Sequence, residues 1–220
     1  MMSTGNFKQD VHAQLARVGK ALSHGNRLEL LEFVAQGPRS VDELAGMTRL
    51  SVANASKHLQ ELRRAGLVQA RKEGLRVYYE LAGPDVVDLI AALGHVAETR
   101  LAEMEQLVRS YITARDELEP IPAAELLKRS KQGLVTVLDV RPAKEFAAGH
   151  LPGAINVAVE DMGKHLRKLP KGREVIAYCR GPYCLLSVDA VALLRTKGYK
   201  ARRLEDGFPE WKASGLPVEA

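Results

Sequence analysis

A segment bracketed by prolines, Glu119-Pro120-Ile121-Pro122, divides the 220 residues into two stretches in which apolar residues are spaced differently. Before it, apolar residues recur every three or four positions, as in an amphipathic helix. After it, short apolar runs alternate with helical patterns, which is typical of a parallel sheet covered by helices. At about 100–200 residues per domain, the length allows two small domains. We therefore expect a mainly-α domain followed by a small α/β domain with a parallel sheet.

The composition excludes several other classes of protein. An apolar fraction of 46% and a charged fraction of 27% are those of an ordinary globular chain. Two cysteines are too few for a disulfide scaffold, and no apolar run approaches the roughly 20 residues that span a bilayer. The first residues, MMSTGNFKQD, are too polar for a signal peptide. We expect a cytoplasmic protein with reduced thiols and no membrane partner.

The net charge of +5 is distributed unevenly along the chain. Residues 1–82 carry +4, residues 83–119 carry −5 and residues 120–220 carry +6. Such a mild excess is often only a solvated surface. The order of signs nevertheless indicates two basic modules joined by a segment that does not contact an anion.

The first 82 residues have the pattern of a winged helix-turn-helix. Apolar spacing predicts helices over residues 11–22 and 28–34, and Ser40 with Glu43 forms a capping-box pattern that opens a short helix ending near Gly46. A fourth helix runs from about Ser51 to Leu62. Two β-prone runs, residues 67–70 and 76–81, then flank a turn and predict a hairpin.

The fourth helix is the one that can enter a major groove about 12 Å wide. Asparagine and glutamine can bond an adenine edge, lysine can reach guanine or phosphate, and basic residues of the hairpin can contact the DNA backbone. The expected DNA-binding residues are Ser51, Asn54, Ser56, Lys57 and Gln60 on the helix, and Arg71, Lys72 and Arg76 in the hairpin.

About 75 residues of this half resemble the ArsR/SmtB family of bacterial repressors. The most specific part is the run from Ser56 to Val68, SKHLQELRRAGLV, together with Arg27, Val41-x-Glu43-Leu44-Ala45 and the Gly74 wing. The resemblance implies a homodimer that binds a double-stranded DNA operator, blocks transcription and releases DNA when an inducer binds.

The metal site of some family members has no counterpart here. Metal-sensing members carry a cysteine-bearing segment on the helix before the reading helix, where this chain has residues 39–44, RSVDEL, without cysteine. A thiolate site for arsenic, cadmium or lead is therefore absent. The histidines of this half do not pair at helical spacing. We expect no metal and no cofactor.

Residues 84–113 are predicted to form a dimerisation helix. The family places its dimer helix here, and the acidic charge of this segment would repel DNA. The alternative is a helix packed only on its own domain. The expected seam, roughly 40 Å long at about 1.5 Å per residue, consists of Val86, Ile90, Leu93, Ala97, Leu101, Met104, Val108 and Tyr111.

After a linker over residues 114–121, the strand and helix alternation predicts strands at 134–140, 154–157 and 175–178, a helix through Leu166 and a helix from Leu185 to about Lys197. Cys179 follows the strand 175–178, at the carboxyl edge where α/β sheets bind ligands. Backbone N–H groups of a loop that opens a helix stabilise an anion, and Arg180 favours a thiolate. These features indicate a nucleophilic cysteine, against the alternative of a buried structural thiol.

Residues 122–220 resemble the rhodanese family of sulfurtransferases. The resemblance is carried by residues 138–156, LDVRPAKEFAAGHLPGAIN, by Tyr178-Cys179-Arg180-Gly181, and by residues 204–218, LEDGFPEWKASGLPV. It implies that Cys179 takes sulfane sulfur from thiosulfate or a persulfide and passes it to a thiol acceptor. The substrate-binding loop would comprise Arg180, Gly181, Pro182 and Tyr183. We interpret Asp139, Arg141 and His150 as scaffold residues.

Pro182 and Cys184 depart from the family pattern, in which the last loop position is often arginine, serine or threonine. Pro182 has no N–H to donate, and Leu185 stands where a phosphatase or arsenate-reductase version of the fold needs arginine, which excludes that chemistry. Cys184 is either a small apolar residue at a helix start or a resolving thiol that attacks a persulfide on Cys179.

The sequence thus predicts a winged helix-turn-helix domain over residues 1–83 joined to a rhodanese-like domain over 122–220. Our main hypothesis is a dimeric repressor whose C-terminal domain senses or transfers sulfane sulfur through Cys179. Two alternatives stay open: a sulfurtransferase merely tethered to a DNA-binding module, and a recruitment domain without catalysis.

Overall fold

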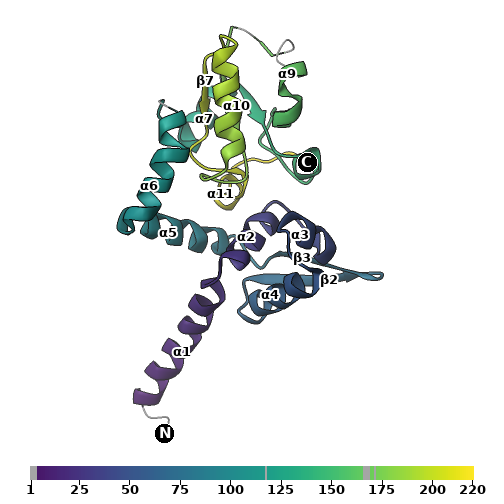
Figure 1. Ribbon diagram of the computed structural model, residues 1–220, viewed down its shortest axis with the longest axis vertical. Helices are drawn as coiled ribbons and strands as arrows, with labels where there is room; N and C mark the ends of the chain where they lie inside the picture. Colours follow the sequence, from purple (N-terminus) through teal and green to yellow (C-terminus); the bar gives the residue numbers. More distant parts are fainter. Residues whose placement is uncertain (1–3, 117, 166–168, 171) are drawn as a thin grey trace. The chain divides into compact units, whose positions relative to one another are not determined.

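The computed structural model describes residues 4–116, 118–165, 169–170 and 172–220. It contains two compact units, Met1–Val86 and Val87–Ala220, which we describe separately (Figure 1). Among the described residues, no helix combines the length and the apolar character that a membrane crossing requires.

The N-terminal unit is a winged helix-turn-helix. Its elements in chain order are α1 (Thr4–Leu22), α2 (Gly25–Val34), β1 (Arg39–Ser40), α3 (Val41–Met47), α4 (Val52–Arg64), β2 (Val68–Glu73) and β3 (Arg76–Leu81). The strands form an antiparallel sheet in the order β1-β3-β2. The two-residue hairpin turn places Gly74 at φ +60°, a conformation that favours glycine. The predicted fold class of this half is confirmed.

The helix pair α3 and α4 is defined by its caps. The Ser40 hydroxyl accepts a hydrogen bond from the Glu43 N–H at 3.3 Å, and the Glu43 carboxylate accepts one from the Ser40 N–H at 2.9 Å. This is the predicted capping box. At the start of α4, the Ser51 hydroxyl accepts from the Asn54 N–H at 3.3 Å. Leu44 of α3 and Leu59 of α4 are fully buried and hold the pair in the core.

Residues 85–115 form two helices and a 3-10 turn where one continuous helix was predicted. The segment contains α5 (Asp85–Arg100), α6 (Ala102–Tyr111) and the 3-10 turn η1 (Thr113–Arg115). Leu101 interrupts the helix with φ −112° and ψ 113°. Shortly before it, the Thr99 hydroxyl donates to the His95 carbonyl at 2.8 Å, a bond that often bends helices. The prediction of one continuous seam over 84–111 was therefore wrong.

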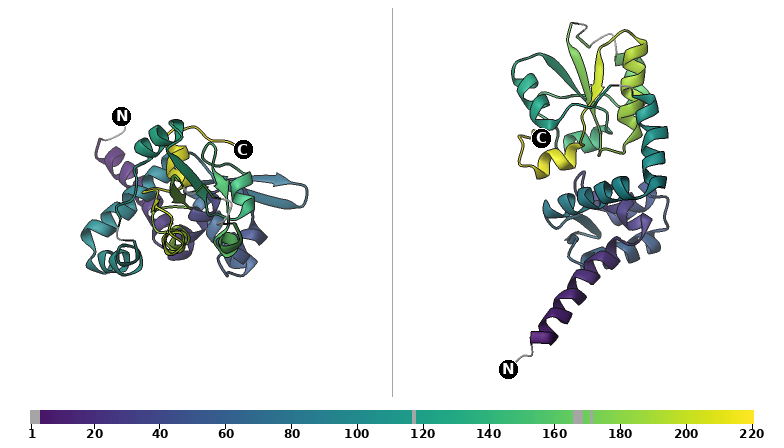
Figure 2. Two further views of the ribbon diagram at one scale, coloured as in Figure 1. Left: turned by 90° about the horizontal axis from the view of Figure 1, so that it is seen from above. Right: turned by 90° about the vertical axis from the view of Figure 1, so that its left-hand side faces the viewer.

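The rest of the C-terminal unit is a parallel sheet covered on both faces, as predicted (Figure 2). The strands β4 (Val135–Asp139), β5 (Ile155–Asn156), β6 (Glu174–Tyr178) and β7 (Ala201–Arg203) lie in the order β5-β4-β6-β7. The remaining elements are α7 (Ala123–Lys131), α8 (Ala143–Ala147), η2 (Val159–Asp161), α9 (Met162–His165), α10 (Leu185–Thr196) and α11 (Phe208–Ala213). Leu166, the predicted end of one helix, lies outside the described residues.

Alternating residues of the strands serve two separate cores. In β6, Val175 and Ala177 pack with Val191 and Leu194 of α10 on one face. Ile176 and Tyr178 face the opposite core, which contains Leu126 of α7 and Trp211 of α11. Cys179, directly after β6, belongs to the α10 side. The sheet therefore places the cysteine loop at its carboxyl edge, next to the start of α10.

Candidate functional site

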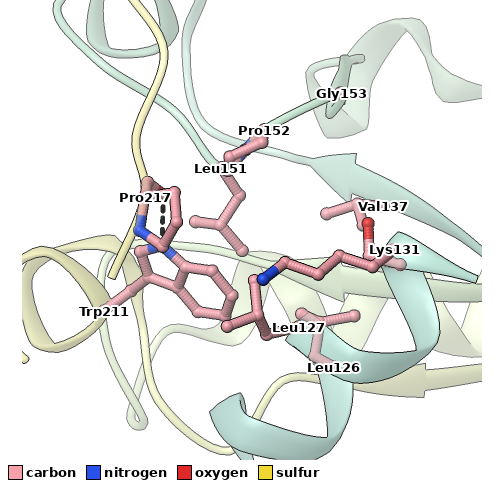
Figure 3. A pocket seen from close by; sticks show the side chains of 10 residues that line it. Leu126, Leu127, Lys131, Val137, Leu151, Pro152, Gly153, Trp211 and Pro217 are labelled. Carbon is pink, nitrogen blue, oxygen red and sulfur yellow. Dashed lines mark hydrogen bonds between the residues drawn. The ribbon is translucent and has the colours of Figure 1, made fainter. Parts of the chain in front are cut away.

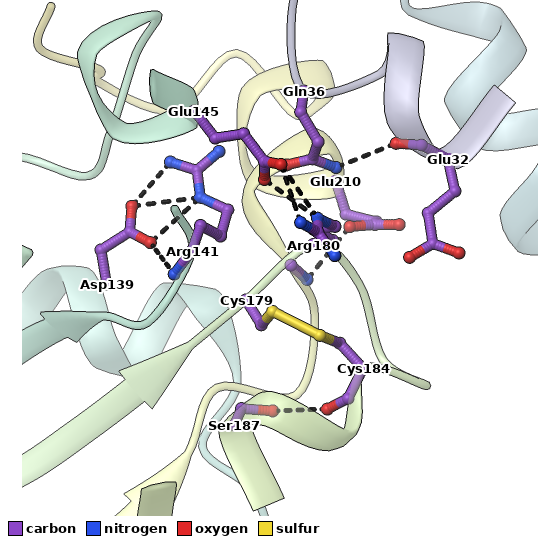
Figure 4. The surroundings of a disulfide bond; sticks show 11 residues. Glu32, Gln36, Asp139, Arg141, Glu145, Cys179, Arg180, Cys184, Ser187 and Glu210 are labelled. Atoms are coloured by element: carbon purple, nitrogen blue, oxygen red, sulfur yellow. Dashed lines mark hydrogen bonds and ion pairs between the residues drawn. A yellow bond between two sulfur atoms is a disulfide. The ribbon is translucent and has the colours of Figure 1, made fainter. Parts of the chain in front are cut away.

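The two cysteines of the chain lie in one loop between β6 and α10. Cys179 is 1% exposed, whereas Cys184 is half-buried and is the N-cap residue of α10. They are joined by a disulfide, with a Cα–Cα distance of 6.2 Å across a separation of five residues (Figure 4). The Cys184 N–H donates to the Gly181 carbonyl at 3.2 Å and closes a tight turn. The loop therefore brings the two sulfur atoms into bonding reach.

The charge of Arg180 is balanced by Glu145 of α8. The Arg180 guanidinium donates to both carboxylate oxygens of Glu145, from Nη2 at 2.8 Å and from Nε at 3.0 Å. Glu145 is 1% exposed, so this is a buried ion pair (Figure 4). The sequence motif contained Glu145, but nothing in the pattern assigned it as the partner of Arg180. Arg180 thus fixes the cysteine loop on α8, and its charge beside Cys179 is offset by the Glu145 carboxylate.

The backbone at Gly207 and Phe208 contacts the cysteine loop directly. The Phe208 N–H donates to the Cys179 carbonyl at 3.0 Å. A Cβ on Gly207 would lie 2.3 Å from the Gly181 nitrogen and 2.5 Å from the Arg180 carbonyl carbon. Only glycine therefore allows this approach of two backbones. We therefore expect the conformation of the cysteine loop to depend on the segment before α11.

A buried network lies beneath the loop. Arg141 is fully buried, donates to the Asp139 carboxylate at 2.6 Å and to the Gly149 carbonyl at 2.7 Å, and stacks on the Phe208 ring. The Tyr178 hydroxyl donates to Asp139, and desolvation together with that carboxylate raises the pKa of Tyr178. These partners satisfy the groups that the sheet edge buries. The sites of Asp139 and Arg141 fit the scaffold interpretation.

His150, the third residue that we interpret as scaffold, directly follows Gly149, whose carbonyl accepts from Arg141. Its ring stacks on Phe146 with 3.7 Å between centroids, and its Nδ1 is 3.0 Å from the Phe146 carbonyl oxygen. Its N–H also donates to the Glu219 carbonyl at 2.8 Å. The geometry therefore ties the chain end to the loop after α8.

An apolar pocket lies on the sheet face opposite to the α10 side, between α7 and α11 (Figure 3). Its walls include Leu127, Leu151 and Pro217, and the Trp211 indole N–H donates to the Pro217 carbonyl at 2.8 Å. Cys179 belongs to the other core. The pocket is thus separate from the cysteine loop.

Three of the predicted DNA-reading residues lie on the exposed face of α4, whereas Ser51 is the N-cap before the helix and Ser56 is half-buried. Asn54, Lys57 and Gln60 are exposed, whereas Ala55, Leu59 and Leu62 are fully buried. Two of the predicted residues also have local roles: Ser51 caps the helix, and Ser56 accepts a hydrogen bond from the Gln60 amide at 3.4 Å. This face of α4 is therefore polar and exposed to solvent.

The hairpin β2–β3 carries the predicted basic residues at its surface. Arg71, Lys72 and Arg76 are all exposed. Arg71 pairs with Glu73 on the same strand. Glu80 of β3 offsets one of the two remaining cations, so the hairpin keeps a net charge of +1.

Two histidines meet where α2 begins. The rings of His24 and His58 lie 4.5 Å apart between centroids, and His24 Nδ1 accepts from the Asn26 N–H as a helix cap. Desolvation, followed by the charges of His24, Arg27 and Lys57, lowers the pKa of His58. Among the residues that the structure describes, no group of three metal-ligating side chains is found.

Comparison with known proteins matches both halves. The family described as bacterial regulatory protein, arsR family, matches residues 24–70, and the rhodanese-like domain matches residues 122–214. The HTH-type transcriptional regulator Rv0324 of Mycobacterium tuberculosis is 44% identical over 206 residues, which covers 94% of this chain and 90% of that protein. A sulfurtransferase of Allochromatium vinosum is 32% identical over 87 residues, covering 39% of this chain and 79% of that protein.

A solved structure is also similar. It is the homodimeric winged helix-turn-helix DNA-binding domain of Mb0332 from Mycobacterium bovis, which is 44% identical, with a TM-score of 0.43, and covers 47% of this chain and 95% of that chain.

A winged helix-turn-helix unit followed by a covered parallel sheet with a cysteine loop at its edge defines a two-domain transcription regulator of the helix-turn-helix type. Within that class, the chain belongs to the ArsR-family regulators that carry a C-terminal rhodanese-like domain. Both resemblances drawn from the sequence are therefore confirmed.

Proposed function

We propose that the chain is a dimeric cytoplasmic repressor that binds operator DNA through α4 and the hairpin, and whose rhodanese-like domain senses or transfers sulfane sulfur through a persulfide on Cys179. The observation that carries the proposal is the single loop that holds both cysteines of the chain and joins them. The N-terminal unit contains no cysteine, so sulfur chemistry is confined to this loop.

The proposed reaction has two steps. The Cys179 thiolate attacks the outer sulfur of a low-molecular-weight persulfide, which leaves a persulfide on Cys179 and releases the donor as a thiol. The Cys184 thiolate then attacks the Cys179 sulfur, forms the disulfide and expels hydrosulfide. Two protein thiols and one persulfide thereby give one disulfide, one thiol and hydrogen sulfide. With thiosulfate as donor, sulfite leaves in the first step.

Charge and exposure support the DNA-binding part. Asn54, Lys57 and Gln60 present two base-reading amides and one cation on one exposed face. Lys72 and Arg76 add exposed cations on the hairpin, which suits contacts to phosphates. The fully buried Leu59 and Leu62 orient that face away from the core.

Two exposed apolar strips support a homodimer. On α1, Phe7, Val11 and Leu15 recur every four residues and are 69%, 39% and 64% exposed. On α5, exposed apolar residues occur at Leu89, Leu93 and Val96, at helical spacing. Strips of this kind mark interaction surfaces. The seam predicted for residues 84–111 is only partly exposed to solvent, because Val86 is buried and Ile90 and Ala97 are half-buried.

The test combines mass spectrometry with DNA binding on the reduced full-length protein. Glutathione persulfide is added, the loop peptide is analysed for an added sulfur or a disulfide, and the affinity for DNA upstream of the gene is measured at fixed salt. We expect treatment with glutathione persulfide to modify Cys179 and change the DNA affinity of the wild type, and to leave the DNA affinity of Cys179→Ser unchanged. Unchanged affinity with fully modified Cys179 would refute the regulatory part.

A second candidate is a sulfurtransferase that is only tethered to the DNA-binding unit. It is favoured by the position of Cys179 at the carboxyl edge of the sheet, next to the start of α10. Steady turnover of thiosulfate or persulfide to a thiol acceptor in Cys184→Ser, with no effect on DNA binding, would select this candidate. Loss of turnover in Cys179→Ser is expected in both cases.

A further inference from the structure

Tyr183 connects the cysteine loop to α5. It directly precedes Cys184, so a change at the Cys179–Cys184 bond acts on its backbone. Its hydroxyl donates to the Glu98 carboxylate of α5 at 3.2 Å. The two residues are 85 positions apart in the chain. Because Tyr183 and Glu98 belong to the same compact unit, the contact is part of one packed body.

The surface of α5 is shaped for this side chain. A Cβ on Gly94 would lie 3.0 Å from the Tyr183 hydroxyl oxygen and 3.4 Å from a ring carbon. Gly94 lies in the middle of a helix, where glycine costs about 1 kcal/mol relative to alanine. The missing side chain leaves room for the phenol one turn away from its acceptor, Glu98.

The phenol stays a hydrogen-bond donor at any physiological pH. Desolvation, and then the charge and hydrogen bond of Glu98, raise the pKa of Tyr183 to about 12. The side chain is 41% exposed, so it can move without opening the core. The contact is therefore both specific and easily displaced.

The helix that follows the cysteine loop, α10, contacts the same chain segment as Tyr183, the one that contains α5 and η1. Cys184 is the N-cap of α10, and Asp189 on α10 pairs with Arg115 of η1. Further along α10, Arg195 pairs with the buried Asp116 at 2.7 Å. The segment that contains α5 and η1 is thus attached to the loop at Tyr183 and to the helix that begins at Cys184.

We propose that Tyr183 is a positioning residue that transmits the sulfur state of the Cys179–Cys184 loop to α5 through Glu98 and the gap at Gly94. The proposal rests on the proposed function, in which the loop cycles between dithiol and disulfide and α5 supplies a dimer surface. Since coupling between two equilibria is reciprocal, association through α5 also shifts the dithiol–disulfide equilibrium of the cysteine pair.

Hydrogen exchange on the full-length protein tests this transmission without knowledge of the operator. Exchange of peptides that cover residues 87–100 is compared between the dithiol form, kept reduced, and the disulfide form, made with diamide. We expect protection of these peptides to differ about two- to tenfold between the two forms, the range that one hydrogen bond accounts for. In Tyr183→Phe and Glu98→Ala we expect that difference to vanish.

Two variants separate transmission from general packing. Glu98→Gln keeps an oxygen that can accept from the phenol, so it retains the difference. Tyr78→Phe removes a phenol hydroxyl from the N-terminal unit, and this variant also retains the difference in exchange between the two forms. The proposal is overturned if the wild type exchanges identically in both forms, or if Tyr183→Phe keeps the wild-type difference.

The same samples, treated with glutathione persulfide and analysed by mass spectrometry, separate this inference from the proposed function. If Cys179 takes up no sulfur while the diamide disulfide still alters α5, the proposed function fails and the transmission stands. If Cys179 reacts and α5 exchange is unchanged, the transmission fails alone.

Discussion

Replacing Gly207 with alanine tests how closely the cysteine loop depends on the segment before α11. The backbone of Gly207 is extended, with φ −108° and ψ −171°, so alanine can adopt its conformation. The obstacle is contact. The new Cβ would lie 2.3 Å from the Gly181 nitrogen, whereas a Cβ essentially never lies closer than 3.0 Å to another heavy atom. The two backbones must therefore separate by about 0.7 Å.

The expected cost has two parts. Overpacking of a closely packed site costs about 1–3 kcal/mol. Separation also weakens the 3.0 Å hydrogen bond from the Phe208 N–H to the Cys179 carbonyl, and one such bond contributes about 1 kcal/mol. We therefore expect Gly207→Ala to lower the free energy of unfolding of the C-terminal unit by about 2–4 kcal/mol.

Urea denaturation followed by tryptophan fluorescence measures this change. The chain has one tryptophan, Trp211, which is 2% exposed in the C-terminal unit and reports on that unit. Gly163→Ala is the matched control, because a Cβ there meets nothing within 4 Å and Gly163 lies in α9. If both variants unfold within about 0.5 kcal/mol of the wild type, the close approach at Gly207 does not restrain the loop.

Three further predictions concern other parts of the molecule. Asp116→Ala removes the carboxylate that pairs with Arg195 and Arg203, and we expect a loss of about 3 kcal/mol in urea denaturation; a loss below about 1 kcal/mol would contradict the ion-pair assignment. The lowered pKa of His58 means that the unfolded chain binds its proton more readily, so stability falls as the pH drops through about 6.5, and His58→Gln flattens that dependence in circular dichroism melts. Lys57→Gln is expected to reduce the salt slope of DNA binding by about one, whereas an unchanged slope would exclude a phosphate contact.

Local signals predicted the parts of the fold that local interactions determine. The capping box of Ser40 and Glu43 spans only three residues, and the structure forms it as expected. The turn at Gly74 likewise follows from the residues beside it. The position of Cys179 after β6 also followed from the sequence, because the ends of parallel strands meet at one edge of a sheet.

Other features were missed because the decisive interactions are not in the apolar pattern. Leu101 continues the helical spacing of its neighbours, so the break there was not expected. The strand β7 contains Arg202 and Arg203, which the apolar pattern does not mark as a strand. It pairs with β6, and Glu174 and Asp116 pair with the two cations. The pair of Arg180 with Glu145 joins residues 35 positions apart, which no spacing rule detects.

The position of the helix break matters for the proposed transmission. A helix carries a displacement along its axis only where its hydrogen bonds are continuous, and α5 is continuous from Asp85 to Arg100. Gly94 and Glu98, which contact Tyr183, both lie within it. The stretch from Glu98 back to Asp85 is roughly 20 Å long at about 1.5 Å per residue. Since Leu101 interrupts the helix beyond Glu98, the break leaves the stretch of α5 that contacts Tyr183 intact.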